Sequence, residues 1–168
     1  MMKKFLTLFV CGGFLLVLLC FVGIDLGFRV KKSVPADDFE AVVSLAQKSL
    51  HWEDGEALKV VENGDYMAVL LSDGERDAAY ILERDQWFGS RVKPYGGQQQ
   101  GEIGKLKYCC MGHDEIQIDL FFGSDLEQES YCYELKGQRY ERPIDDGILL
   151  DLLITDASEG FSSAVWWE

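Results

Sequence analysis

Histidine is scarce in this chain, and the common catalytic motifs are missing. Only His51 and His113 occur, and neither lies in a motif. No Gly-x-Ser-x-Gly surrounds Ser124, and the Gly96-Gly97 pair lacks the Lys-Ser or Lys-Thr that follows a phosphate-binding loop. The sequence therefore predicts no catalytic residues and no cofactor, and a hydrolase with an unrecognised site stays as a minor alternative.

Positive charge is also in short supply. From Ser33 onward the chain has 11 lysines and arginines against 28 aspartates and glutamates, a net charge of −17. Such a domain repels nucleic acid, which excludes that class of partner, and is compatible with a basic protein. Asp73, Glu75 and Asp77 begin like a calcium-binding loop, but Ala78 and Arg84 stand at its sixth and twelfth positions, so the match fails.

The few cysteines do not form a recognisable metal or disulfide pattern. Cys109, Cys110, His113 and Cys132 lack the paired spacing of a zinc site, because adjacent strand residues point to opposite faces. Alternation places Cys109 and Cys132 on one outward face. In a simple meander the strand 115–122 would separate them by about 9–10 Å, too far for a disulfide. We predict no metal site, and keep Cys109 and Cys132 as thiol candidates, because a strand order that is not sequential would allow the disulfide.

A long uncharged run is the strongest positive signal. Residues Phe5 to Ile24 contain no charge and, as a helix, would span about 30 Å, the thickness of a bilayer core. The run is longer than the apolar core of a cleavable signal, and no fitting cleavage site follows it. A cleaved signal, or a lipoprotein processed at Cys11 or Cys20, is the alternative. We predict an uncleaved signal-anchor that binds the lipid bilayer through this run.

The flanks of the run give a weak prediction of sidedness. Residues 1–4 form a short basic tail with Lys3 and Lys4, and the juxtamembrane linker 25–36 carries Arg29, Lys31 and Lys32. The two flanks are nearly equal in positive charge, but long domains translocate largely regardless of charge. We therefore predict a single-pass cell-membrane protein with its C-terminal domain outside the cytoplasm.

Residues 37–168 are predicted to form one acidic, mainly β domain. Asp37 resembles an N-cap, with Glu40 three residues later, before an amphipathic helix over 38–50. Eight or nine short segments of strand character follow, separated by turn residues such as Asn63-Gly64 and Lys136-Gly137. The range 94–101 is predicted to be a flexible loop. These features indicate an antiparallel β-sandwich or a strongly curled sheet, with the last strand paired into it.

Several aromatic residues form candidate binding positions. Adjacent aromatic residues on a strand point to opposite faces, so one of each pair lies outside a one-sided core. The candidates for a ligand surface are Trp87, Phe88, Tyr95, Trp166 and Trp167, near the range 94–101. We predict a non-enzymatic binding or sensing domain held at a membrane. The alternative is a membrane-tethered immunity or inhibitor protein with an acidic face toward a basic partner.

Overall fold

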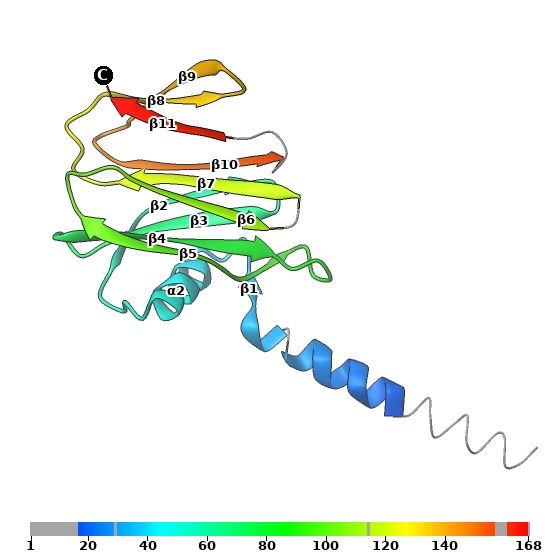
Figure 1. The fold of residues 1–168 in the computed structure, drawn as a ribbon. Coiled ribbons are helices and arrows are strands. Elements are labelled where there is room, and N and C mark those ends of the chain that lie inside the picture. Colours follow the sequence, from blue (N-terminus) through cyan, green and yellow to red (C-terminus); the bar gives the residue numbers. More distant parts are fainter. Residues whose placement is uncertain (1–16, 29, 114, 157–160, 168) are drawn as a thin grey trace, which may run out of the picture.

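The computed structural model describes residues 17–28, 30–113, 115–156 and 161–167. Three antiparallel sheets lie in a stack, and helix α2 (Phe39–Leu50) covers the outer face of the largest sheet (Figure 1). The prediction of a mainly β fold with antiparallel sheets is confirmed. The third sheet adds a layer beyond a simple sandwich.

The largest sheet lies between α2 and the second sheet. Its strand order is β1-β5-β4-β3-β2, with bounds β1 (Val34–Pro35), β2 (Glu56–Asn63), β3 (Tyr66–Ser72), β4 (Arg76–Arg84) and β5 (Arg91–Glu102). One face of β3 and β4, with Val69 and Leu82, packs on α2. The other face, with Leu70 and Ile81, packs on the second sheet. The central residues of both strands therefore form an uninterrupted apolar run rather than an alternating pattern.

The second sheet also has two covered faces. Its order is β10-β7-β6, with bounds β6 (Lys107–His113), β7 (Ile116–Gly123) and β10 (Leu149–Asp156). Phe122 packs toward the first sheet, and Phe121 packs toward the third. The third sheet has the order β11-β8-β9, with bounds β8 (Ser130–Leu135), β9 (Gln138–Pro143) and β11 (Phe161–Trp167). The predicted pairing of the last strand is confirmed, since β11 pairs with β8.

Helix α2 forms where the sequence predicts it, with a different cap. Asp38, not Asp37, is the N-cap, and its Oδ1 accepts a hydrogen bond from the Ala41 amide at 3.0 Å. Asp38 has the extended backbone that an N-cap requires, which places Phe39 at the first helical position. The apolar stripe of Val42, Ala46 and Leu50 is buried.

An N-terminal helix precedes the domain. Residues 17–28 and 30–32 are helical, so helical backbone is present within the range 25–36 that was predicted to be a linker. Residues 5–16 of the predicted membrane span lie outside the described residues. Within the described part of the chain, no helix combines the length and the apolar character needed to cross a membrane.

Two turn predictions need correction. The β2–β3 hairpin is confirmed, but Asn63 pairs with Tyr66, so its two-residue loop is Gly64-Asp65. The range 94–101, predicted to be a flexible loop, is part of β5 and pairs with β4 as far as Gly101 opposite Asp77. The glycines and glutamines of this range are typical of a loop. In the structure, register shifts on both sides of Ile81 accommodate the extra residues of β5 as bulges.

Candidate functional site

An acidic groove of about 420 Å³ lies at one end of the first sheet. Its walls come from the segment after α2, the start of β2, the β3–β4 turn, and the residues that follow β5 and β7. The lining side chains include four carboxylates, and the full set is Asp54, Glu56, Leu58, Ser72, Asp73, Gly74, Ile103, Ser124 and Asp125. Four carboxylates around one concavity favour a cationic group over an anionic or apolar one.

The β3–β4 turn forms a well-ordered wall of this groove. Asp73 Oδ1 accepts hydrogen bonds from the amides of Glu75 (3.0 Å) and Arg76 (2.8 Å), and the Arg76 guanidinium donates to Asp73 Oδ2 at 2.8 Å. Gly74 takes φ = +85°, which a residue with a side chain rarely adopts. Partial desolvation raises the pKa of Asp73, but the hydrogen bonds from Arg76 outweigh it and lower the pKa below its ordinary value.

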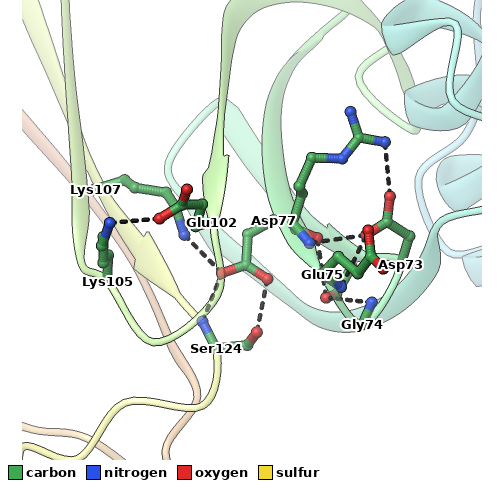
Figure 2. A network of polar contacts seen from close by, with 10 residues as sticks. Asp73, Gly74, Glu75, Asp77, Glu102, Lys105, Lys107 and Ser124 are labelled. Atoms are coloured by element: carbon green, nitrogen blue, oxygen red, sulfur yellow. Dashed lines mark hydrogen bonds and ion pairs between the residues drawn. The ribbon is translucent and has the colours of Figure 1, made fainter.

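A buried ion pair supports the opposite wall (Figure 2). Asp77 of β4 is fully buried, and Lys107 of β6 donates from Nζ to its Oδ2 at 2.8 Å. Ser124 donates to the same carboxylate from its amide (2.8 Å) and from Oγ (2.6 Å). The stem of Lys107 passes so close to Gly101 that an added Cβ there would lie 2.6 Å from Cε. The pair thus joins the first two sheets and fixes Ser124 and Asp125 at the groove.

The chemistry of this network suits binding better than nucleophilic catalysis. Ser124 is buried, and its hydroxyl proton is directed to a carboxylate that Lys107 already neutralises. A serine nucleophile needs an accessible oxygen and a base with spare proton affinity. Within the described residues, no group of three His, Cys, Asp or Glu side chains is arranged to hold a metal ion.

The predicted thiol candidates lie in different sheets. Cys109 is in β6 and packs against the core between the first two sheets, while Cys132 is in β8. Cys132 was predicted to face outward, but it is fully buried, and Arg139 Nη2 donates to its Sγ at 3.3 Å. Neither is in a disulfide. Cys110 is exposed on β6, and desolvation by neighbouring atoms raises the pKa of its thiol.

Of the predicted aromatic positions, Trp87 and Tyr95 lie in different surroundings. Trp87 is 71% exposed in the loop after β4, beside Phe88. Tyr95 is half-buried in the core between the first two sheets, where its ring meets that of Tyr66 edge-on at 5.2 Å. Trp166 and Trp167 lie on β11, and their side chains are outside the described part of the structure.

A second polar layer, between the second and third sheets, was not predicted from the sequence. Asp119 is fully buried and accepts hydrogen bonds from Tyr108 Oη (2.5 Å) and from Gln117 Nε2 (3.0 and 3.1 Å). On the neighbouring strand, Asp151 accepts a hydrogen bond from Tyr131 Oη. The signal for this layer was the pair Tyr131 and Tyr133 in β8, because a buried tyrosine usually needs an acceptor.

These tyrosines predict a loss of stability at alkaline pH. Burial first, and then the hydrogen-bonded carboxylate, raises the pKa of Tyr108 and of Tyr131 above the ordinary value of 10.0. A raised pKa means that the folded state keeps a proton which the unfolded state releases. The stabilisation is therefore complete below pH 10 and is lost as pH rises, by about 1.4 kcal/mol per pH unit for each tyrosine.

Urea unfolding of the full chain at pH 9, 10 and 11 measures this slope. The double variant Tyr108→Phe/Tyr131→Phe is expected to show a shallower decline than the wild type. A single Tyr140→Phe variant, at an exposed position outside this layer, is the control for the removal of a tyrosine hydroxyl. An identical slope in the double variant and the wild type would contradict the prediction.

Comparison of this chain with protein-family models, with curated proteins and with solved structures finds no match.

Proposed function

We propose that this chain is a single-pass membrane protein whose β domain binds a basic partner in the acidic groove. The uncharged run of residues 5–24 supports the anchor, and the net charge of −17 from Ser33 onward supports a cationic partner. The observation that carries the proposal is the groove, because four carboxylates meet there in one concavity. The domain is proposed to lie outside the cytoplasm.

The position of the groove suits a partner that approaches from solution. Asp73 comes just before β4, and Trp87 follows the end of β4. A strand of nine residues spans about 30 Å, so the groove lies that far from the Trp87 loop. Arg91, just beyond that loop, donates to the Val30 carbonyl at 3.2 Å, which places the N-terminal helix at the end of β4 opposite the groove. An anchor at one end would leave the groove open at the other.

The carboxylates of the groove are available to a ligand. Asp54, Glu56 and Asp125 are exposed, and among the described residues no ion pair engages them. Asp73 alone is paired, with Arg76. A lysine or arginine side chain entering the groove would therefore meet three unneutralised carboxylates.

An immunity or inhibitor protein against a basic toxin would use the same surface. Loss of the partner's activity on binding would distinguish this alternative from a binding or sensing domain.

Site-specific photocrosslinking tests this proposal. A photoreactive amino acid in place of Ile103, an uncharged residue that lines the groove, is expected to crosslink a partner on irradiation of the full chain in its native membranes. Raising the salt concentration to about 0.5 M should remove the product, because salt screens exposed charge pairs. The same amino acid at position 115, which is exposed on another surface, is the control and should give no such product.

Charge reversal in the groove measures how much its carboxylates contribute to binding of the partner. With the crosslinker at position 103, the variant Asp54→Lys/Glu56→Lys should reduce the product at least about tenfold, because like charges across an interface cost several kcal/mol. The variant Asp65→Lys/Glu115→Lys changes net charge equally at exposed positions away from the groove. An equal loss in both variants would show that only the overall charge matters, and no loss in the first would place the partner elsewhere.

A further inference from the structure

The exposed apolar side chains of this protein collect at one end of the domain. Among the described residues, eleven large apolar side chains are exposed, and eight of them belong to the N-terminal helix between Val17 and Val30. Two more are Phe39, at the start of α2, and Trp87, in the loop between β4 and β5. Only Tyr140 lies elsewhere. A large exposed apolar patch that is confined to one region in this way marks a surface that contacts a partner.

Hydrogen bonds bring these three segments together. The Ala36 amide, between β1 and α2, donates to the Ser90 carbonyl at 2.8 Å. Arg91 donates from Nη2 to the carbonyls of Val30 and Ser33, and from Nε to Ser33 Oγ at 2.9 Å. The end of the N-terminal helix is thus clamped to the start of β5. Figure 1 shows this helix leaving the domain from the region of β1.

The β4–β5 loop, residues 85–90, is held in a fixed shape. Asp85 is only 2% exposed, and its Oδ1 accepts hydrogen bonds from the amides of Trp87 (2.8 Å) and Phe88 (3.1 Å). Arg84 donates to the Gly89 carbonyl at 2.8 Å, and the Arg91 amide donates to the Phe88 carbonyl at 2.7 Å. A buried carboxylate therefore organises a loop whose tip presents an exposed tryptophan.

Trp87 faces the N-terminal helix across an apolar recess. The recess measures about 340 Å³, and its lining residues are Phe21, Val22, Asp25, Leu26 and Trp87. Apart from Asp25, every lining side chain is apolar or aromatic. The recess therefore suits a flexible hydrocarbon group, such as an acyl chain, better than a polar ligand.

We propose that the β4–β5 loop rests in the interfacial layer of a phospholipid bilayer, with Trp87 among the headgroups. This inference depends on the proposed membrane anchor. Lipid is favoured over a second copy of the chain because the patch continues directly into the uncharged run 5–24. Tryptophan prefers the interface, where its ring is apolar and its N–H meets water.

The charge distribution agrees with this contact. Lys31 and Lys32 are exposed at the same end, at the junction of helix and domain, where they can bind lipid phosphates. The acidic groove, which lipid phosphates would repel, lies at the other end of β4. With the helix end clamped by Arg91 and the loop in the headgroups, two contacts fix the domain's orientation. The groove is then directed away from the bilayer.

Fluorine NMR of the full chain in phosphatidylcholine vesicles tests the loop. The protein is labelled with 5-fluorotryptophan at its four tryptophans, and a Trp87→Phe variant assigns the Trp87 signal. A nitroxide lipid with its spin label near the headgroup is expected to broaden the Trp87 signal strongly. It should leave the signal of Trp52, which is buried beneath α2, largely unchanged.

The other outcomes separate the inference from the proposed function. Broadening of the Trp87 signal by a water-soluble paramagnetic agent, without an effect of the nitroxide lipid, would overturn the loop contact. If neither the nitroxide lipid nor the water-soluble agent broadened the Trp87 signal, Trp87 would lie in a protein interface, such as one with a second copy of the chain. This result would also overturn the loop contact. Vesicle flotation at high salt is measured in parallel for the wild type and Trp87→Phe. If neither floats, the membrane anchor itself is wrong.

Discussion

Replacing Lys107 with methionine is expected to lower the free energy of unfolding by about 3–5 kcal/mol, because it leaves a charge buried without its partner. Methionine keeps most of the aliphatic stem but removes the ammonium that lies 2.8 Å from Asp77 Oδ2. The Asp77 side chain is fully buried, so water cannot replace the lost partner. Urea unfolding of the full chain, followed by circular dichroism, measures the change.

Two further variants separate the charge from the packing. Lys105→Met removes an ion pair with Glu102 in which both side chains are at least 70% exposed, and should cost less than about 1 kcal/mol. The double variant Asp77→Asn/Lys107→Met removes both charges and should recover much of the loss. If Lys107→Met costs no more than Lys105→Met, the buried pair does not stabilise the fold. If the double variant recovers nothing, lost packing is responsible instead.

Local signals in the sequence predicted most of the elements. The apolar spacing of Val42, Ala46 and Leu50 identified α2, and turn residues identified the β2–β3 hairpin and the β8–β9 hairpin. At Lys136-Gly137, both residues adopt the positive φ that a two-residue hairpin turn requires. Each of these signals depends on residues close together in the chain, where spacing and turn chemistry have a direct structural meaning.

Layering of the sheets could not be predicted in the same way. The alternation of residues in β7 and β8 correctly separates the two faces of each strand. In a domain with a single core, one of these faces would be exposed to solvent. The third sheet covers that second face of β7, so Asp119 is buried. Cys132, on the face of β8 predicted to be exposed, is buried too. Whether a strand lies within a stack depends on contacts between distant segments, which periodicity does not record.

The candidate site was missed for the same reason. Asp77 and Lys107 are thirty residues apart, and each appears in the sequence as an ordinary charged residue of a strand. The groove combines side chains from four separate connections and from the start of β2, so no local motif describes it. The acidic composition did predict a preference for basic partners, but not where they would bind.

Replacing Phe121 with alanine is expected to destabilise the protein by about 3–5 kcal/mol, the usual cost of removing a large buried aromatic side chain. Phe121 is fully buried between the second and third sheets. Its ring lies 5.0 Å from that of Tyr108, 5.2 Å from that of Tyr131 and 6.0 Å from that of Tyr133. Its removal leaves a cavity at the centre of this aromatic cluster.

The neighbouring residue provides a matched control. Phe122 is equally buried but packs between the first and second sheets, so Phe122→Ala should cost a similar amount by opening a different layer. Hydrogen exchange in the native state distinguishes the two variants. Phe121→Ala should selectively reduce protection of the β8 amides, whereas Phe122→Ala should reduce protection in β3 and β4. If both variants lost β8 protection equally, the β8 amides would exchange only when the whole domain unfolds. The aromatic cluster would then have no separate role in holding the third sheet.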